Sequence, residues 1–297
     1  ILQLAEKGAL SIDDDCKKYL PELPYDGISI RNLMNHVSGI PEYFDVFNRY
    51  RGPLDTLDNN GLLKMFATYK PELDFKTGST WQYCNTNYAL LVSVIERVSG
   101  QPIKQYVSEH ITKPLKLNDT YIYSDLMSSV PANHVIGFSE DNGAKKLNDL
   151  TNVDGVIGDG NLYSSVEDLF TWEQSLYKPT ILKKATLDEA FKPVRLNDGK
   201  TYPYGFGWFI ESDSLGLYWH TGGWAGFINL LFRDTKLKRT LVVLSSGSNG
   251  SANQAAKAIL HDQPYTPTPT TLIRNVQLVD GTGLPARKAD VRIEGNQ

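Results

Sequence analysis

The stretch that decides the fold is Trp219-His220-Thr221-Gly222-Gly223-Trp224-Ala225-Gly226-Phe227. It lies within a series of short runs rich in β-branched and aromatic residues, at 206–210, 217–220, 227–232 and 239–245, which Gly, Asp, Ser and Lys turns separate. Runs of this length and composition predict neighbouring antiparallel strands joined by tight turns. We therefore expect an antiparallel meander, in which His220 to Gly223 follow one strand and lead towards the next.

A buried helix is predicted upstream of the meander, because apolar residues recur there at helical spacing. The residues at positions i, i+3, i+4, i+7 and i+10 are Tyr88, Leu91, Val92, Ile95 and Val98. Gly100 follows them and predicts the end of the helix. Tyr83-Cys84-Asn85 come just before it, so we expect them on a loop that enters the helix, where side chains are held firmly and can still face a cleft.

Further helices are predicted where capping residues, glycines and prolines mark their ends. The first helix ends at Gly8, a short second one runs through Tyr19 and Leu20, and a third covers 29–36 with a stop at Ser38-Gly39. A fourth lies between Pro102 and Pro114, a fifth covers 168–178 after a capping box at 164–167, and a sixth covers 252–260. The last of these is expected to pack on one face of the sheet. Together the helices and the meander predict a mixed fold of helices around an antiparallel sheet.

Composition excludes two classes of partner. The chain has 297 residues, of which 41% are hydrophobic, so it can bury one large core or two modest ones. Its 30 basic and 34 acidic residues are mixed along the sequence and leave a net charge of −4, which argues against a nucleic-acid partner. No apolar run approaches the roughly 20 residues that span a bilayer, so no transmembrane segment is expected. The oligomeric state stays open.

No metal site or cofactor is predicted. The two cysteines, Cys16 and Cys84, cannot form a disulfide framework and lack the spacing of a zinc site. His110 and His134 have no partner at ligand spacing. The acidic run Asp13-Asp14-Asp15 lacks the twelve-residue pattern of a calcium loop, so we interpret it as a helix cap and surface.

Several motifs together resemble the serine β-lactamase and penicillin-binding protein-like hydrolases, in their class C and esterase branch. The resemblance runs from Ile1 to about His261, and its motifs in combination are specific, whereas each alone is weak. They are the segment 29–39, the block 75–100 with Tyr83-Cys84-Asn85, Lys113-Pro114-Leu115, the segment 204–208 and His220-Thr221-Gly222. The resemblance implies an α/β (α+β) domain of the β-lactamase/transpeptidase-like fold, with helices flanking an antiparallel sheet and a helical subdomain.

The resemblance assigns catalytic roles to two residues before the buried helix. It implies that Tyr83 is the phenol that relays protons between nucleophile and leaving group, and that Asn85 holds the substrate amide or a lysine. The alternative for this pair is a buried tyrosine and a helix cap. Cys84 stands where the family commonly has serine, which leaves the role of this middle residue open.

On the strand side, the resemblance assigns substrate and oxyanion binding to His220, Thr221, Gly222 and Gly223. It implies that the Gly223 N–H is one oxyanion donor, and a glycine without a Cβ lets the backbone approach a developing oxyanion closely. His220 replaces the lysine that is common at its position, so a titratable group stands in place of a fixed cation. A strict preference for β-lactams is therefore not implied.

The family's nucleophile is a Ser-x-x-Lys pair at the start of a helix, in which the lysine takes the serine proton. The resemblance places it about three helical turns before Leu4, ahead of the first residue given. We therefore expect an N-terminally truncated domain that is inactive as given. The pair Ser175 and Lys178 is predicted to face solvent on a helix and is interpreted as unrelated. Cys84 with His36 or His220 as base is an alternative without a local sign of activation, and His36 is expected to be structural.

The C-terminal part differs in composition. Residues 263–271 are rich in Pro and Thr, which predicts a linker, and 272–279 and 289–294 predict two strands around a tight turn. This tail resembles the opening strands of D-aminoacylase-type amidohydrolases, and an orphan hairpin is an equally good interpretation. No metal or activity carries over, because no His-x-His pair is present. The predicted domains are thus 1–262, a linker at 263–271 and a fragment at 272–297.

The parent protein is expected to be a serine hydrolase that forms an acyl-serine on esters, D-amino-acid peptides or β-lactams, so its partner is a small ester, amide or peptide. Two alternatives remain: a non-catalytic module of the same fold that binds substrate, and the N-terminal part of a fusion to a metal-dependent amidohydrolase. Members of the family are often exported, but the sequence leaves the location open. Without the N-terminal strands of the family, 240–244 should form an unpaired apolar edge.

Overall fold

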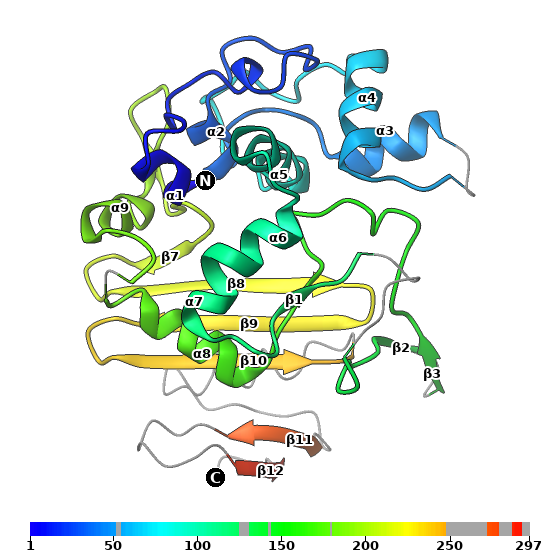
Figure 1. Cartoon of the computed structure of the whole chain (residues 1–297), viewed down its shortest axis with the longest axis vertical. Helices are drawn as coiled ribbons and strands as arrows, with labels where there is room; N and C mark the ends of the chain where they lie inside the picture. The colour runs from blue at the N-terminus through cyan, green and yellow to red at the C-terminus, as the bar shows by residue number, and fades with distance from the viewer. Residues whose placement is uncertain are drawn as a thin grey trace. The chain divides into compact units, whose positions relative to one another are not determined.

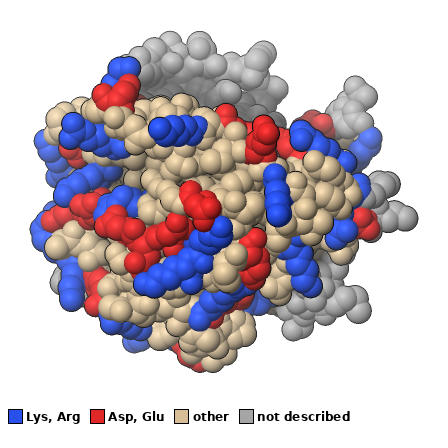
Figure 2. Space-filling view, turned by 90° about the horizontal axis from the view of Figure 1, so that it is seen from above, with Lys and Arg blue, Asp and Glu red and all other residues tan. Residues whose placement is uncertain are grey.

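Two interleaved groups of segments make up the structure, a computed structural model that describes residues 1–51, 55–124, 131–141, 144–178, 180–247, 272–278 and 287–292. Unit 1 comprises Ile1–Val130, Thr151–Ser164 and Gln174–Ile210. Unit 2 comprises Pro131–Leu150, Ser165–Glu173 and Glu211–Gln297. Within these described ranges, no helix is long and apolar enough to cross a membrane. On the face drawn in Figure 2, acidic and basic side chains lie interspersed.

Unit 1 is built around the long buried helix α5 (Asn85–Ser99), which α1, α2, α4 and α6 contact (Figure 1). Leu90 and Val94 of α5 are fully buried, and Gly100 ends the helix in a left-handed conformation. The predicted helix and its stop are therefore confirmed. The other helices of the unit are α1 (Leu2–Glu6), α2 (Ile30–Met34), α3 (Tyr43–Tyr50), α4 (Asn59–Tyr69), α6 (Ile103–Val107), α7 (Lys113–Leu115) and α9 (Lys184–Ala190).

Short elements complete unit 1. A 3₁₀ turn covers Cys16–Lys18, and a π-helical turn, Ser108–Thr112, joins α6 to α7. Two small antiparallel pairs are formed by β1 (Tyr121–Ile122) with β4 (Leu162–Tyr163) and by β5 (Val194–Arg195) with β6 (Thr201–Tyr202).

Three helix boundaries in unit 1 differ from the prediction. The helix expected at Tyr19 and Leu20 is only the 3₁₀ turn that Asp15 caps. The helix expected at 29–36 ends at Met34, because His36 takes a left-handed φ of 58° that lets its ring enter the core. Pro114 does not end a helix but lies in the first turn of α7, where its missing N–H is tolerated.

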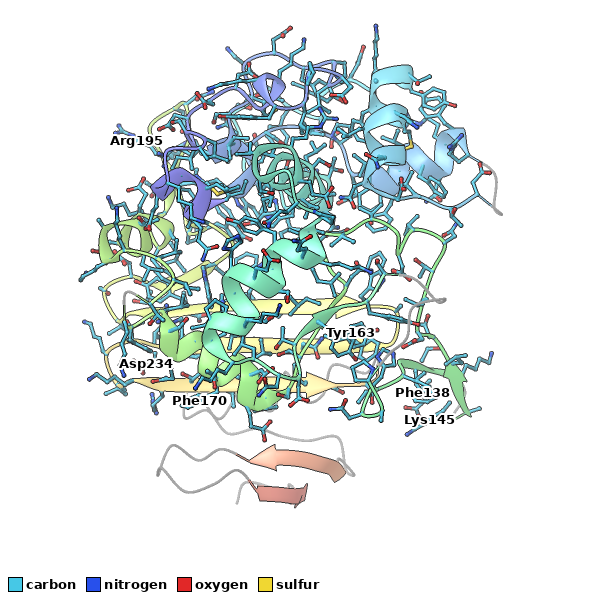
Figure 3. All side chains as sticks on the ribbon, viewed as in Figure 1. Phe138, Lys145, Tyr163, Phe170, Arg195 and Asp234 are labelled. Atoms are coloured by element: carbon cyan, nitrogen blue, oxygen red, sulfur yellow. The ribbon has the colours of Figure 1, made fainter. Side chains whose placement is uncertain are left out.

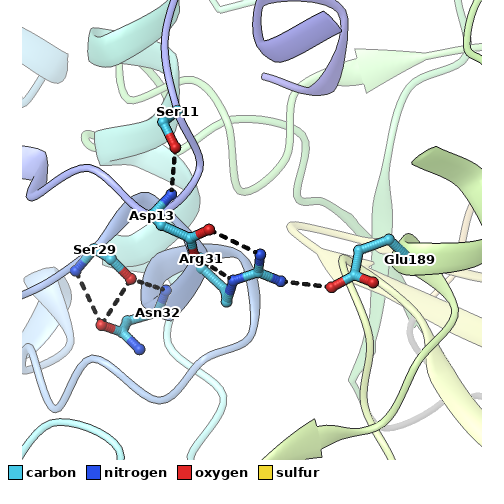
Figure 4. A network of polar contacts seen from close by, with 6 residues as sticks. All are labelled: Ser11, Asp13, Ser29, Arg31, Asn32 and Glu189. Atoms are coloured by element: carbon cyan, nitrogen blue, oxygen red, sulfur yellow. Dashed lines mark hydrogen bonds and ion pairs between the residues drawn. The ribbon is translucent and has the colours of Figure 1, made fainter. Parts of the chain in front are cut away.

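Arg31 of α2 ties together distant segments of unit 1 (Figure 4). Its Nε donates to Asp13 Oδ1 at 2.6 Å, its Nη1 donates to Glu189 Oε1 of α9 at 2.8 Å, and its guanidinium lies over the Phe206 ring at 5.6 Å. The acidic run at 13–15 therefore contributes a cap and surface ion pairs, as its interpretation from the sequence required.

Unit 2 contains the observed meander except for Phe209 and Ile210, the first two residues of its first strand, which belong to unit 1. Its strands β7 (Phe209–Ser212), β8 (Leu217–Trp224), β9 (Phe227–Asp234) and β10 (Arg239–Ser245) form a sheet in the order β10-β9-β8-β7 (Figure 1). β8 is longer than predicted, because the segment from His220 to Gly223 stays in the ladder and pairs with Leu231 to Ile228 of β9. The meander is thus confirmed, with the glycines inside a strand, but its first strand covers 209–212 and not the predicted 206–210.

The edge predicted at 240–244 is present. β10 is an end strand of the sheet and pairs with β9 in an unbroken register from Arg239 opposite Asp234 to Ser245 opposite Ile228. Its apolar residues are half-buried, and Leu244 is 39% exposed. In the part of the chain that the structure describes, no strand pairs with the other side of β10.

Two hairpins also belong to unit 2. Figure 3 shows Phe138 and Lys145 on the hairpin of β2 (Phe138–Asp141) and β3 (Ala144–Leu147). In the tail, β11 (Leu272–Leu278) pairs with β12 (Arg287–Arg292) in antiparallel fashion, which confirms the two predicted strands. The helix predicted at 252–260 and the linker predicted at 263–271 lie outside the described residues.

Helix α8 (Val166–Ser175) begins two residues earlier and ends three residues earlier than the predicted 168–178, and it buries a different face. Its cap is Ser165, whose Oγ accepts the N–H of Asp168 at 3.2 Å. Ser175 is 7% exposed, so the prediction that it faces solvent was wrong. The prediction from the spacing of apolar residues failed because the buried face includes Glu173, a charged residue that such spacing does not reveal. Ser175 ends a helix instead of starting one, so the pair Ser175 and Lys178 remains unrelated to the nucleophile motif.

A buried ion pair explains the position of Glu173. Its Oε1 accepts from Arg233 Nε of β9 at 2.9 Å, and its Oε2 accepts from Thr240 Oγ1 of β10 at 2.7 Å. The side chains of Arg233 and Glu173 are 2% and 0% exposed. One carboxylate therefore joins α8 to two strands of the sheet.

Replacing Glu173 by alanine should destabilise the protein strongly, because it leaves the Arg233 cation buried without its carboxylate. We expect a loss of about 3–5 kcal/mol in the free energy of unfolding, measured by urea titration. The control Asp188→Ala breaks the exposed pair with Lys184 and should cost less than about 1 kcal/mol. Equal losses in the two variants would contradict this account of the ion pair.

Candidate functional site

Tyr83 lies on the loop that enters α5, and 39% of its surface is exposed. Its ring packs on the His36 ring, with 4.3 Å between the ring centroids. Partial burial, helped by the nearby carboxylates of Asp159 and Glu42, raises the pKa of Tyr83 to about 12. The phenol is therefore protonated at neutral pH and can donate its proton to a leaving group.

The side chain of His36 packs against this loop and accepts a hydrogen bond from its backbone. Its Nδ1 accepts the backbone N–H of Cys84 at 3.2 Å and lies 3.2 Å from Nδ2 of Asn87. Because two N–H donors point at Nδ1, the neutral ring carries its proton on Nε2. Aromatic rings surround the imidazole, namely those of Trp81, Tyr83, Tyr88 and Tyr204. The geometry supports the structural role that we expected for His36.

Cys84 is not placed as a nucleophile. Its side chain is buried, and its Sγ donates to the carbonyl oxygen of Ile40 at 3.2 Å. Burial raises the pKa of the thiol to about 12, so the thiolate is not formed at neutral pH. His36 meets the backbone N–H of Cys84, and not its sulfur. The alternative of a Cys84–His36 pair therefore finds no support.

Asn85 is the first residue of α5, and Glu42 accepts from it twice. Glu42 Oε2 lies 2.8 Å from the backbone nitrogen of Asn85 and 3.0 Å from its Nδ2. Glu42 Oε1 accepts the N–H of Tyr43, the first residue of α3, at 3.0 Å. Burial raises the pKa of Glu42, while these N–H bonds oppose that shift. The cap of α5 is thus supplied by Glu42, and the side chain of Asn85 is held against it.

The segment 36–39 runs beside the residues that precede the loop. The carbonyl oxygens of His36, Val37 and Gly39 accept the N–H groups of Gln82, Gly78 and Asp74 at 3.1, 2.8 and 2.8 Å. Gly39 has φ of +80°, and a Cβ at this position would lie 2.1 Å from the carbonyl oxygen of Phe75. Close approach of the two segments therefore depends on glycine.

Two acidic residues near Tyr83 were missed by the sequence reasoning. They are Glu42 and Asp159; Asp159 Oδ2 accepts the hydroxyl of Tyr43 at 2.8 Å. Burial raises the pKa of Asp159 to about 7. The signal for Glu42 was available, since it follows Pro41 directly before a helix, whereas Asp159 had no signal beyond its place between two glycines.

The remaining predicted site residues lie together on β8. His220, Thr221, Gly222 and Gly223 belong to unit 2, whereas Tyr83 and Asn85 belong to unit 1. His220 Nδ1 donates to the carbonyl oxygen of Thr221 at 2.6 Å, so the neutral ring keeps its lone pair on Nε2. Burial lowers the pKa of His220, and the ring is therefore uncharged at neutral pH. Within the described ranges, no three His, Cys, Asp or Glu residues are grouped to hold a metal ion.

Comparison with known sequences gives consistent matches. The family model described as Beta-lactamase matches residues 1–263. Penicillin-binding protein 4* of Bacillus subtilis (strain 168) is 32% identical over 282 residues, which cover 89% of this chain and 62% of that protein. The putative penicillin-binding protein PbpX of the same strain is 28% identical, over 85% of this chain and 59% of that protein. The chain thus spans about three fifths of the length of these two relatives.

Solved structures agree on the fold. A penicillin-binding protein from Bacillus halodurans matches with a TM-score of 0.74 at 24% identity, over 87% of this chain and 80% of that one. A D-stereospecific amidohydrolase from Streptomyces sp. matches with a TM-score of 0.71 at 27% identity, over 86% and 81%. The predicted fold, helices around an antiparallel sheet as in β-lactamases and transpeptidases, is confirmed.

Gly39→Ala should destabilise the protein by at least about 2 kcal/mol, because it adds a clash with Phe75 to the strain of a left-handed alanine. The matched control is Gly8→Ala, where φ is +70° but a Cβ meets nothing within 4 Å, so only about 1 kcal/mol of strain is expected. Urea titration of both variants checks the difference. A Gly39 variant no less stable than the Gly8 variant would show that the two segments do not need this close approach.

Proposed function

The chain belongs to the Beta-lactamase family of serine hydrolases, and from this premise we propose that it carries proton-transfer and substrate-binding residues of an enzyme that hydrolyses esters, D-amino-acid peptides or β-lactams through an acyl-serine. The attacking serine and its lysine come from a Ser-x-x-Lys outside residues 1–297. Residues 1–262 form the hydrolase domain, 263–271 a linker and 272–297 a further fragment.

The observation that carries the proposal is the loop at 83–85, which presents a protonated phenol and a carboxamide from a fixed backbone. The serine oxygen attacks the substrate carbonyl carbon while the lysine takes its proton. Tyr83 then donates its proton to the leaving group as the tetrahedral intermediate collapses to the acyl-serine. Water attacks the acyl-serine in the second step, and the acid is released. Asn85 holds an amide of the substrate or the lysine.

The glycines of β8 support the same reaction. A Cβ on Gly223 would meet no described atom within 4 Å, and its φ is not left-handed, so packing does not require glycine there. Glycine is required there if the Gly223 N–H donates to the oxyanion, because a substrate oxygen must then approach the backbone closely. Losing one such donor costs about 3 kcal/mol of transition-state stabilisation. His220 and Thr221 lie on the same strand and contact the substrate beside this oxygen.

A second candidate is a non-catalytic module that binds the same substrates. It is favoured by one observation: the Ser-x-x-Lys pair within residues 1–297, Ser175 with Lys178, stands at the end of α8 and not at a helix start. The two candidates differ in whether a covalent intermediate forms.

The test is to express the complete reading frame that encodes residues 1–297 and to incubate the protein with a fluorescent penicillin and with a fluorophosphonate. The enzyme proposal predicts a one-to-one covalent adduct on a serine of a Ser-x-x-Lys, seen by intact mass and peptide mapping. A reading frame without Ser-x-x-Lys, whose product binds substrate and forms no adduct, would overturn the enzyme proposal in favour of the binding module.

Tyr83→Phe should lower the rate of ester hydrolysis by that protein by about 10²–10⁴-fold, because the variant keeps the ring on His36 and loses the proton donor. Steady-state hydrolysis of a nitrophenyl ester measures the rate. The control Tyr69→Phe removes a hydroxyl from an exposed tyrosine of α4 and should leave the rate unchanged. A Tyr83→Phe variant within about twofold of the unchanged protein would rule out the proton-relay role.

His220→Lys should favour substrates that carry a carboxylate. The pKa of His220 is lowered, so the wild-type ring is neutral at pH 8, whereas lysine is charged. A hydrogen bond to a charged group is worth about 1.5–3 kcal/mol, so acylation by an anionic penicillin relative to a neutral ester should rise by roughly tenfold or more at pH 8. The advantage should shrink at acidic pH, below the lowered pKa of His220, where the ring gains its proton. An equal advantage at both pH values would contradict a neutral His220.

A further inference from the structure

The carboxylate of Glu42 uses both of its oxygens at the start of two helices. Oε1 accepts the N–H of Tyr43 at 3.0 Å, and Oε2 accepts the N–H and Nδ2 of Asn85 at 2.8 and 3.0 Å. Helix starts leave N–H groups without partners inside the helix, so an acceptor is required at each. A carboxylate meets all three donors because it only accepts when ionised.

This contact decides which way the Asn85 carboxamide is turned. A carboxamide has a donor end and an acceptor end of almost equal shape, and only the donor end can face a carboxylate. Nδ2 of Asn85 therefore points to Glu42, and its Oδ1 is turned away from Glu42. In the other orientation, Oδ1 would face the carboxylate at about the same distance and repel it.

We propose that Glu42 is a positioning residue of the reaction, which holds Oδ1 of Asn85 ready to accept an N–H from the substrate amide or from the lysine. The proposal rests on the proposed function for the role of Asn85. Glu42 itself touches neither substrate nor nucleophile, and it acts through the carboxamide. Its second contact, with Tyr43, keeps the carboxylate in place by the start of α3.

Glutamine has the same shape but cannot meet all three donors. It has one acceptor oxygen, whereas the donors approach Glu42 at two. If that oxygen faces Asn85, the new NH₂ group meets the N–H of Tyr43, which then donates only to its second acceptor, Thr86 Oγ1 at 2.7 Å, and the two donors repel each other. If the oxygen faces Tyr43, the NH₂ group meets both donors of Asn85, and the carboxamide of Asn85 can turn over. Both arrangements weaken the hold on Asn85.

The test is a double-mutant cycle of Glu42→Gln and Asn85→Ala in the product of the complete reading frame, with ester and amide hydrolysis as the readout. Glu42→Gln should lower kcat at least tenfold with little change in KM, and should lower it less than twofold when Asn85 is already alanine. The control Glu22→Gln removes an exposed partner of Arg97 in the same unit and should leave kcat unchanged. An equal loss with and without Asn85 would overturn the proposal, because Glu42 would then act only on general structure.

A second readout separates this proposal from the proposed function. If the unchanged protein hydrolyses no ester or amide and forms no adduct, the proposed function fails. Whether Glu42 positions the carboxamide of Asn85 is then tested by ¹⁵N–¹H correlation spectra of residues 1–297. Selective displacement of the Asn85 side-chain NH₂ signals in Glu42→Gln, with most of the spectrum unmoved, supports it. Unmoved NH₂ signals overturn it, since the carboxamide would not depend on the carboxylate.

Discussion

The start of α5 is the constraint on which the rest of unit 1 depends. A buried helix exposes N–H groups at its first turn, and Cys84, at its N-cap, supplies no side-chain acceptor to them. The acceptors lie in a segment more than forty residues earlier: the imidazole of His36 accepts the N–H of Cys84, and the carboxylate of Glu42 accepts that of Asn85. The loop at 83–85 is therefore held by side chains that are distant in sequence, which fixes its backbone in one conformation.

This constraint also explains the shape of the supporting segment. His36 must leave α2 in a left-handed conformation to bring its ring under Cys84, and Gly39 must lack a Cβ to run beside Phe75. Tyr83 then rests on the buried imidazole with its phenol half-exposed, and Asn85 turns its amide to Glu42. Preorganisation of this kind lets a site meet a transition state without rearranging its own groups.

Sequence reasoning predicted the parts of the fold that have a period or a stop signal. The meander, α5 with Gly100, and the tail strands were found because alternation, helical spacing and glycines are local. The end of α2 and the buried face of α8 were predicted wrongly, because His36 and Glu173 enter the core through partners that no local pattern shows. The resemblance proposed Tyr83 and Asn85 as site residues, yet the residues that hold them, Glu42 above all, appear only when contacts across the chain are known.

Native-state hydrogen exchange of the backbone amides of Cys84 and Asn85 tests this account most directly. If His36 and Glu42 hold the loop, both amides should exchange as slowly as those of Leu90 and Val94 in the core of α5, with an opening free energy close to that of global unfolding. Exchange of Cys84 and Asn85 at the rate of exposed loop amides would contradict the account, because the loop would then open freely while the helix behind it stays folded.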